Sequence, residues 1–381
     1  MYGKEKGGSV IPLARPTIGR EELRNIEKVF KTHWLGMGSF VYDFEKKVEA
    51  YIGVKHAIAV NTGTTAIHLA LASINIGPGD EVVVPSLTFV ATIQPIINLG
   101  AKPVFCEVEP DTLKIDMDDA AKRITKRTKA IIPVHYGGMA CDMDEVLSIG
   151  RARGIAVVED AAHAFGSSYK ERKIGSFGDL TCFSFDPIKN LTCGEGGAVT
   201  TNDARTAEIL RRKRLLGISK DTWTRYKHKR SWFYEVSIEG YRYHMSNINA
   251  AIGLAQFKKF ENFIRKKKKM VRQYDDFFKD MEGIELLTRD YEATAPFNYT
   301  IKIKKHRDKF IHYMEKRGIA VGVQYIPNHL QPFFKKYRQS LPVTEKVWKE
   351  IVSLPLHYDM KAEEVQTVQR SVEEFLKKDE K

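Results

Sequence analysis

Seven short apolar runs, separated by segments with a helical pattern, constrain the fold of this chain most strongly. The runs are His56–Val60, Glu81–Val84, Pro103–Val108, Ala130–Val134, Ile155–Glu159, Leu180–Phe185 and Ala198–Thr201. Several are continuously apolar, which is typical of strands buried on both faces of a mostly parallel sheet. Between them, segments such as Thr65–Ile74 and Met143–Arg153 repeat apolar residues at three and four positions. The alternation predicts a large α/β domain.

The pattern changes after about residue 245. Charged stretches with a helical pattern surround two short strand-like runs, Tyr299–Ile303 and Ala320–Gln324; the stretches are Ile248–Met281, Arg307–Arg317 and Lys361–Lys378. We therefore predict that residues 1–245 form the large domain, N-terminal segment included, and that residues 246–381 form a linking helix and a small α+β domain. A chain of 381 residues, 43% of them apolar, is long enough to bury both cores.

Composition limits the classes of function. The net charge of +13 is compatible with nucleic acid, an anionic membrane surface or small anionic ligands. No apolar stretch approaches ~18 residues and the N-terminus lacks a signal-peptide core, so we expect no membrane span. The four cysteines show no CxxC or zinc spacing, which predicts no metal site and favours a reducing, cytoplasmic setting; they are Cys106, Cys141, Cys182 and Cys193.

The stretch Asn61–Thr65, NTGTT, follows one predicted strand and begins a helix. Backbone N–H groups at a helix start, together with threonine hydroxyls, form an anion site that suits a phosphate. The structural alternative is a helix cap with a turn glycine. The stretch is neither a Walker A loop nor a GxGxxG dinucleotide fingerprint.

Two acids, Glu159 and Asp160, end the predicted strand in VVEDAAH. The carboxyl edge of parallel strands is where α/β sheets place their ligands, so one of the two acids should face a crevice. A carboxylate there can keep a heteroaromatic nitrogen protonated. The structural alternative is that Asp160 caps the following helix.

Lys189 lies just past the run Leu180–Phe185 and before the glycine-rich stretch Gly194–Gly197. This position puts it at the same sheet edge as Asn61–Thr65 and Asp160. A lone lysine there is ordinarily exposed to solvent. A phosphate cup, an acid and a lysine on one edge, however, are the set that holds pyridoxal phosphate (PLP).

Long motifs, spread in order over nearly the whole chain, resemble the DegT/DnrJ/EryC1/StrS family of PLP-dependent sugar aminotransferases. They include NTGTTAIHLAL, GDEVVVPSLTFVAT, VVEDAAHAFGS, SFDPIKNLTCGEGG, GYRYHMSNINAAIGLAQ and VQYIPNH. The resemblance implies the fold-type I (aspartate aminotransferase-like) architecture, with a mostly parallel mixed sheet and a small C-terminal domain. It also implies PLP or its amino form PMP as cofactor, L-glutamate as the amino donor, and a homodimer with shared active sites.

The resemblance assigns roles to individual residues. Lys189 matches the Schiff-base lysine and Asp160 the partner of the pyridine nitrogen. Further matches are Gly63, Thr64 and Ser184 for the phosphate, Phe89 and His163 for the ring faces, and Arg242 for a phosphate contact in the neighbouring subunit. His329, Asp186 and Trp34 are expected near the substrate. Asn298 and His244 depart from the family pattern and receive no role.

The lysine at position 189 favours transamination, because the family's sugar 3-dehydratases carry histidine there. The resemblance implies amination of a nucleotide-linked keto sugar, most closely C4 of an NDP-4-keto-6-deoxyhexose, for surface polysaccharide such as O-antigen lipopolysaccharide. A 3-dehydratase-like lyase and a C3 aminotransferase remain alternatives.

Basic residues at 265–269 are typical of a solvated helix face. The basic and aromatic stretch 211–234 resembles a nucleic-acid groove, but the resemblance favours a nucleotide-diphosphate contact, so we expect neither nucleic acid nor membrane as a partner.

Overall fold

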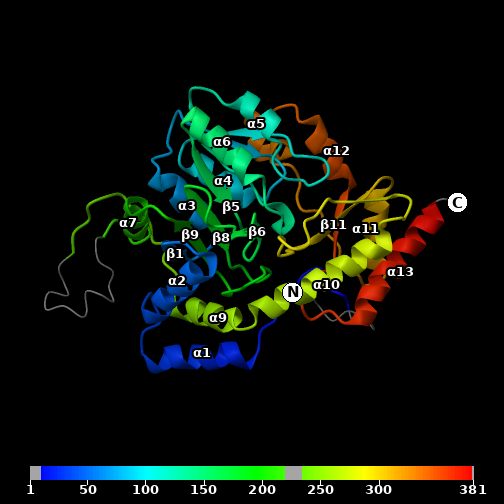
Figure 1. Cartoon of the computed structure of the whole chain (residues 1–381), viewed down its shortest axis with the longest axis horizontal. Helices are drawn as coiled ribbons and strands as arrows, with labels where there is room; N and C mark the ends of the chain where they lie inside the picture. The colour runs from blue at the N-terminus through cyan, green and yellow to red at the C-terminus, as the bar shows by residue number, and fades with distance from the viewer. Residues whose placement is uncertain (1–9, 219–233, 380–381) are drawn as a thin grey trace.

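The predicted apolar runs form the strands of the central sheet (Figure 1). The computed structural model describes residues 10–218 and 234–379. The sheet has seven strands in the order β1-β9-β8-β5-β4-β2-β3. Their bounds are β1 His56–Val60, β2 Glu81–Pro85, β3 Lys102–Cys106, β4 Thr128–Ile131, β5 Ala156–Asp160, β8 Leu180–Ser184 and β9 Gly197–Thr201. Only β9 runs antiparallel to its neighbours, so the prediction of a mostly parallel sheet is confirmed.

Helices cover both faces of this sheet, because successive strand residues point to opposite sides. In β1, Ala57 and Ala59 belong to one core cluster and Ile58 and Val60 to the other. The first face is covered by α2 (Ser39–Ile52), α5 (Met117–Arg123) and α6 (Met143–Arg153). The second is covered by α3 (Gly63–Ser73), α4 (Val90–Asn98) and α7 (Ala204–Lys213). Both layers bury apolar side chains, which fixes the sheet edge where the predicted ligand residues lie.

The single helix predicted over Ile248–Met281 is wrong, because the chain forms two helices there. Helix α9 (Asn247–Phe257) packs on α1 (Arg20–Lys31) and α2, and α10 (Phe260–Phe278) runs on toward the C-terminal domain (Figure 1). At the break, the N–H groups of Lys258 and Lys259 donate to carbonyls only three residues earlier. The break lets an apolar helix face the large domain while the next helix presents a charged side to solvent.

The C-terminal domain is built on an antiparallel sheet of β10 (Ile284–Leu286), β11 (Tyr299–Ile303) and β12 (Ile351–Leu354). It is covered by α10, α11 (Arg307–Lys316) and α13 (Ala362–Asp379), and α12 (Pro342–Glu350) precedes β12. The strand predicted over Ala320–Gln324 is wrong: only Gly322 forms an isolated bridge, to Ser353. Strands β10 and β12 were not predicted, because they are too short to show a period.

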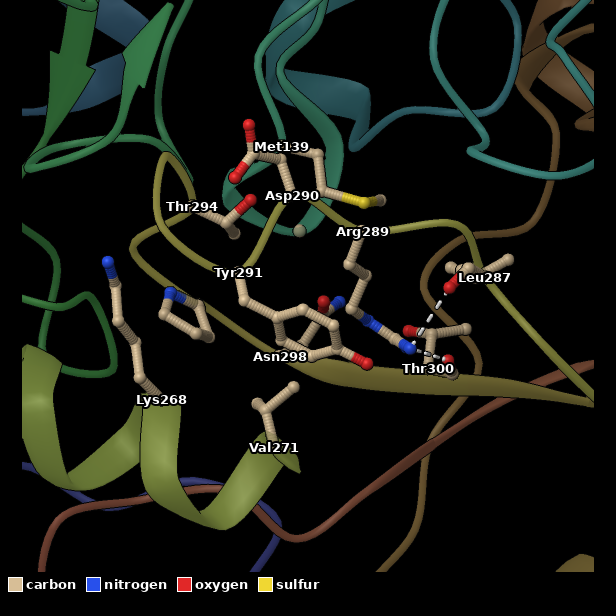
Figure 2. Close-up of a pocket in the computed structure, with 12 residues that line it drawn as sticks. Met139, Lys268, Val271, Leu287, Arg289, Asp290, Tyr291, Thr294, Asn298 and Thr300 are labelled. Carbon is tan, nitrogen blue, oxygen red and sulfur yellow. Dashed lines mark hydrogen bonds between the residues drawn. The ribbon is translucent and has the colours of Figure 1, made fainter. Parts of the chain in front are cut away.

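A buried polar network joins α10 to the small sheet, and Figure 2 shows the part of it in which Arg289 bonds to Leu287 and Thr300. Arg289 Nη1 lies 3.0 Å from Asp275 Oδ1, and the guanidinium also donates to the carbonyls of Leu287 and Thr300. Asp275 accepts two further hydrogen bonds, from the hydroxyls of Tyr291 (2.7 Å) and Tyr299 (2.6 Å). Because each buried charge has several hydrogen-bond partners, the network fixes the angle at which α10 leaves the small sheet.

The N-terminal segment meets the small sheet rather than the large one, since Ile11 pairs with Ile319. We propose that α9 be counted with the large domain, which moves the division from the predicted residue 245 to just after Phe257, and that the segment at Ile11 be counted with the small domain. Within the described part of the chain, no helix is both long and apolar enough to cross a bilayer. The same residues contain no group of three or more His, Cys, Asp or Glu side chains arranged for a metal. All four cysteines are free and buried.

Candidate active site

A cavity of about 300 Å³ opens where β5 and β8 end. Most of the predicted site residues line it: Gly63, Thr64, Phe89, Asp160, His163, Ser184, Asp186 and Lys189. They come from four separate parts of the sequence, so only the topology of the sheet brings them together. The site lies at the carboxyl edge of the parallel strands, where α/β sheets bind their ligands.

The start of α3 forms one end of the cavity. Thr62 caps the helix, because its Oγ1 accepts from the N–H of Thr65 at 3.1 Å. The N–H groups of Gly63 and Thr64 have no hydrogen-bond acceptor among the described residues, so the helix presents free donors to the cavity. A Cβ at Gly63 would lie 2.7 Å from Cβ of Ser184, and glycine therefore permits the close approach. The stretch is both a helix cap and an anion cup.

Asp160 is the acid that faces the cavity. Its Oδ2 accepts from Oγ1 of Thr92 at 2.6 Å and its Oδ1 from the N–H of Ala162 at 3.0 Å. The side chain is almost completely buried, and the two donors fix the carboxylate while it lines the cavity. Residues 161–167 form turns rather than a helix, so Asp160 holds a turn instead of capping a helix, and it still presents negative charge to a ligand.

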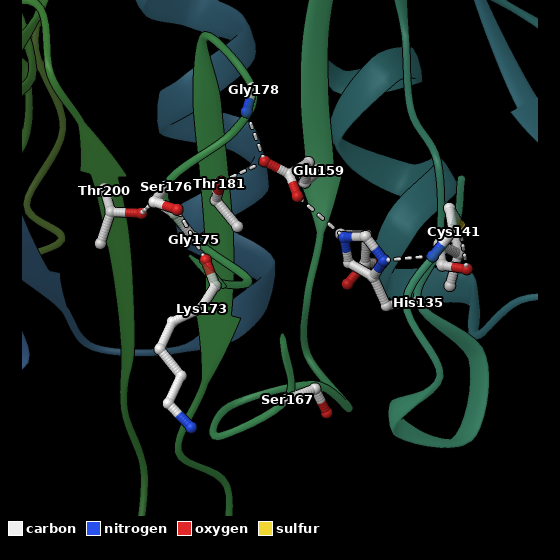
Figure 3. A network of polar contacts seen from close by, with 12 residues as sticks. His135, Cys141, Glu159, Ser167, Lys173, Gly175, Ser176, Gly178, Thr181 and Thr200 are labelled. Carbon is white, nitrogen blue, oxygen red and sulfur yellow. Dashed lines mark hydrogen bonds and ion pairs between the residues drawn. The ribbon is translucent and has the colours of Figure 1, made fainter. Parts of the chain in front are cut away.

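Glu159 points to the opposite side of the sheet, as alternation along β5 requires (Figure 3). Its Oε1 accepts from the N–H of Gly178 (2.7 Å) and from Oγ1 of Thr181 (2.6 Å). Nε2 of His135 lies 2.9 Å from Oε2, and Nδ1 of His135 accepts from the N–H of Cys141. The histidine proton therefore lies on Nε2 and is donated to Glu159. This acid has a structural role.

The Lys189 amine lies in the cavity wall with its Nζ 4.3 Å from the ring centre of Phe297. Among the described residues no hydrogen-bond acceptor or ion-pair partner is in reach of Nζ. Burial lowers the pKa of Lys189 to about 8, although the charges of Asp186 and Asp160 oppose the shift. A substantial neutral fraction near pH 7 to 8 makes the amine a usable nucleophile and base.

Two aromatic groups flank the cavity. Phe89 is 54% exposed although it is a large apolar side chain, so its ring is available to a planar ligand. His163 stacks on Phe297 with ring centres 4.0 Å apart. Its Nδ1 accepts from the N–H of Gly137 at 3.4 Å, and Nε2 lies 3.0 Å from the hydroxyl of Tyr325. Burial, with the nearby lysine charges, lowers the pKa of His163 well below its usual value, so the ring is neutral.

Several residues that line the cavity were missed by sequence reasoning, among them Thr92, Glu195, Gln324 and Tyr325. Gln324 and Tyr325 come from the C-terminal domain, and Glu195 lies in the glycine-rich stretch after Lys189. Thr92, which positions Asp160, is one helical turn beyond Phe89. Tyr325 and Gln324 fall inside the VQYIPNH motif, so that motif was a usable signal. Asn298, which had no role, donates to Oε1 of Gln324 at 2.7 Å and supports this wall.

Three predicted residues lie outside the cavity wall. His329 is buried, with Nδ1 2.7 Å from Oγ of Ser86 and Nε2 3.3 Å from Glu345. Trp34 donates its Nε1–H to the carbonyl of Met37 at 2.8 Å, and Arg242 is exposed. Their assigned roles stay predictions. The basic and aromatic stretch 211–234 falls largely outside the described residues, which exclude Trp223, Tyr226, Lys227, Lys229, Arg230 and Trp232.

The residues present fit pyridoxal phosphate. The open N–H groups of α3, with Thr64 and Ser184, suit its phosphate, and Asp160 suits its pyridine nitrogen. Phe89 and His163 provide flat surfaces for the ring, and the unpaired amine of Lys189 suits its aldehyde. Each part of the cofactor thus has a complementary group within one cavity.

Comparison with known proteins gives the same assignment. The family model described as the DegT/DnrJ/EryC1/StrS aminotransferase family matches residues 16–373. SpsC of Bacillus subtilis, a spore coat polysaccharide biosynthesis protein, is 37% identical over 98% of this chain and 99% of its own. The sugar aminotransferase CalS13 from Micromonospora echinospora superimposes with a TM-score of 0.88 at 29% identity, covering 95% of this chain and 99% of CalS13.

Spr1654 from Streptococcus pneumoniae, solved in PMP and PLP forms, is also similar. Its PMP form superimposes with a TM-score of 0.89 at 29% identity and covers 95% of this chain and 98% of its own. The aspartate aminotransferase-like fold, the enzyme class and the cofactor expected from the sequence are confirmed. The chain belongs to the DegT/DnrJ/EryC1/StrS aminotransferase family, and its cofactor is pyridoxal phosphate.

Proposed function

We propose that this enzyme transfers the amino group of L-glutamate to the keto group of a nucleotide-linked sugar, most specifically C4 of an NDP-4-keto-6-deoxyhexose. The observation that carries the proposal is the amine of Lys189, which lines the same cavity as Asp160 and has no hydrogen-bond or ion-pair partner in the part of the chain that the structure describes. The similarity to SpsC supports a product used in surface polysaccharide. Because the four cysteines are free, we place the enzyme in the reducing cytoplasm.

Lys189 acts as the group that moves protons. With a pKa of about 8 the amine is partly neutral at physiological pH, so it can accept a proton from a substrate carbon and return it. Asp186 and Asp160 keep the pKa from falling further, which preserves the protonated form for the return step. The nearby ring of Phe297 limits where the amine can move.

Asp160 and His163 set the polarity of the cavity. The cofactor, when bound, supplies a conjugated ring that accepts the electrons of a carbanion. Asp160, fixed by Thr92 and Ala162, provides negative charge that holds a proton on the ring nitrogen. His163 is neutral and buried, so it offers a flat surface without competing for that proton.

The mouth of the cavity carries two further carboxylates, Asp186 and Glu195. Burial raises the pKa of Glu195, and the charge of Asp186 adds to the shift. Carboxylates accept hydrogen bonds from sugar hydroxyls, so we assign these two residues to recognition of the sugar. The net positive charge of the chain attracts the anionic nucleotide diphosphate to the same opening.

We also propose a homodimer with shared active sites. The exposed guanidinium of Arg242 lies outside the cavity of its own chain, which suits a contact with the neighbouring subunit. Mixing the inactive variants Lys189→Ala and Arg242→Ala tests this, because a heterodimer contains one site with both native residues. We expect the mixture to regain activity; two inactive variants that stay inactive after subunit exchange contradict the shared site.

The decisive experiment incubates the purified holoenzyme with glutamate and a panel of nucleotide-linked 4-keto and 3-keto sugars. We expect a product in which an amino group replaces the keto oxygen, identified by mass, with the position of nitrogen read by NMR. A keto-deoxy product without nitrogen indicates the lyase alternative, and a 3-amino product indicates the C3 aminotransferase. If no sugar is aminated while glutamate is still consumed in the first half-reaction, the proposed sugar acceptor is wrong but the aminotransferase activity stands.

A further inference from the structure

A second, smaller cavity adjoins the candidate active site. Its volume is about 30 Å³, enough for one or two waters or an ion of the size of chloride. It shares Ile188 and Lys189 with the larger cavity and is otherwise lined by different residues. Among those residues, Arg15, Lys267 and His357 are basic, and none is an aspartate or glutamate. The lining is therefore electropositive wherever its basic groups carry protons.

Several buried polar atoms in this lining have no hydrogen-bond partner among the described residues. They are Oγ1 of Thr17 and both ring nitrogens of His357. His357 is only 5% exposed, and burial, as the largest cause, lowers its pKa, so its ring is neutral and carries one N–H donor. A buried donor without an acceptor costs about 1 to 3 kcal/mol. The cavity between these atoms is where an acceptor fits.

Lys267 adds a buried cation to the same lining. It is 6% exposed, and its Nζ donates to Oδ1 of Asn190 at 2.7 Å and to the carbonyl of Phe297 at 3.2 Å. No carboxylate of a described residue lies within ion-pair distance of Lys267. An ammonium has three donors, and the two bonds use only two of them. The third donor and the charge both require an acceptor.

We propose that this cavity is a binding site for a small anion, of the size of chloride or of a single carboxylate group, held by Lys267, His357 and Thr17. The anion accepts the third donor of Lys267, the N–H of His357 and the hydroxyl of Thr17, and it neutralises the buried ammonium. Arg15 contributes from the exposed side, where it also pairs with Asp359 at 3.4 Å. The proposal does not rest on the identity of the sugar substrate, because it concerns only residues that line the smaller cavity.

The anion has two possible sources, a free inorganic ion or the carboxylate of an amino acid that enters past Lys189. Their chemistry is the same, a planar or spherical monoanion that accepts hydrogen bonds. Bromide is a suitable probe for the free ion, because it resembles chloride and its position is visible by anomalous diffraction. Glutamate is the probe for the second source.

The first experiment soaks crystals of the holoenzyme in bromide and measures the anomalous signal. We expect a peak in the cavity between Lys267, His357 and Thr17. The variant Lys267→Met keeps the side-chain length but removes the charge, and it should lose the peak. Its matched control is Lys269→Met, which removes an exposed charge from the same helix two residues away and should keep it. Density for water alone in the wild-type cavity overturns the proposal.

Bromide titration in solution, at constant ionic strength, gives a second measurement that needs no crystal of the variant. We expect at least about a tenfold loss of bromide affinity in Lys267→Met, since a charge-assisted hydrogen bond contributes roughly 1.5 to 3 kcal/mol. Equal affinities in Lys267→Met, Lys269→Met and wild type contradict the site. Competition by glutamate, but not by a neutral amine, assigns the natural occupant to an amino-acid carboxylate. No competition assigns it to the free ion.

The pH dependence provides an internal check in the wild type. Burial, as the largest cause, and the charge of Lys189 lower the pKa of Lys267 to about 7. The ammonium is present below that pKa, so bromide should bind most tightly below pH 7 and weaken as the pH rises above it. The other ionisable groups that line the cavity are Lys189, Arg15, His357 and Tyr358, with Asp359 and Glu364 beyond them. An affinity that stays constant from pH 6 to pH 8.5 contradicts a role for Lys267.

Discussion

Two neighbouring carboxylates on β5, Glu159 and Asp160, face opposite sides of the large sheet and have different surroundings. Each is held by a threonine hydroxyl at 2.6 Å, Thr181 for Glu159 and Thr92 for Asp160. Glu159 also accepts from Gly178 and from His135, and it is completely buried. Asp160 has only Ala162 as a second donor and lines a cavity. Alternation along the strand creates this difference from two adjacent acids.

The two faces of the large sheet therefore have different roles: one contributes to stability and the other binds a ligand. On the rear face both carboxylate oxygens of Glu159 and both ring nitrogens of His135 are hydrogen-bonded inside the protein, so these groups stabilise the sheet. On the cavity face, the described residues offer no hydrogen-bond or ion-pair partner to the amine of Lys189 and no acceptor to the N–H groups of Gly63 and Thr64. Buried polar groups without partners are rare, and they mark the face that binds a ligand.

The largest effect is expected for Lys189→Ala. Activity should fall by at least about a thousandfold, because both the covalent attachment and the proton transfer are lost. The visible absorbance of the lysine-bound cofactor should disappear, while unfolding by denaturant should change little. Lys269→Ala, on the exposed side of α10, should behave as wild type. A Lys189→Ala protein that keeps both absorbance and turnover contradicts the role of the lysine.

Matched amide substitutions on the two acids test the comparison directly. Asp160→Asn should lower kcat by roughly a hundredfold, through loss of charge toward the ring nitrogen, with little change in stability. Glu159→Gln should lower the free energy of unfolding by about 1 to 3 kcal/mol, because an amide N–H would face the N–H of His135. The two variants are compared by denaturant unfolding and by single-turnover rate. Reversed effects would contradict the division between the faces.

Much of this site was predictable from the sequence. The strands that carry it are apolar runs; Asp160 ends one of them and Gly63 and Lys189 lie a few residues after others, where local pattern and edge chemistry agree. The strand pattern alone did not decide whether Glu159 or Asp160 faces the cavity, since a one-residue uncertainty in strand register reverses it; only the family resemblance pointed to Asp160. Tyr325 and Thr92 were missed because their contacts span 162 and 68 residues. Long-range contacts of this kind leave no periodic signal.

Removing the hydroxyl of Thr92 or of Thr181 tests the same difference between the two faces, with a smaller expected effect. Thr92→Val should lower kcat about tenfold, because Asp160 loses one of its two donors and its orientation toward the cavity loosens. Thr181→Val removes an equally short bond from Glu159 and should lower stability by about 1 kcal/mol without changing kcat. Rates measured at saturating substrate, together with thermal unfolding, separate the two outcomes. Equal losses of activity in both variants would mean that the faces are not independent.

The smallest expected effect concerns the pH dependence of Lys189 in the cofactor-free protein. Burial lowers the pKa of its amine to about 8, so labelling of Lys189 by an amine reagent should rise with pH through about 8, well before exposed lysines react. Asp186 opposes this shift, because its negative charge favours the ammonium. Asp186→Asn should therefore lower the pKa further and increase the neutral fraction at pH 7 by about two- to fivefold. Glu159→Gln, on the rear face, should leave the labelling midpoint unchanged. A midpoint that rises in Asp186→Asn would show that this carboxylate does not act on Lys189 through its charge.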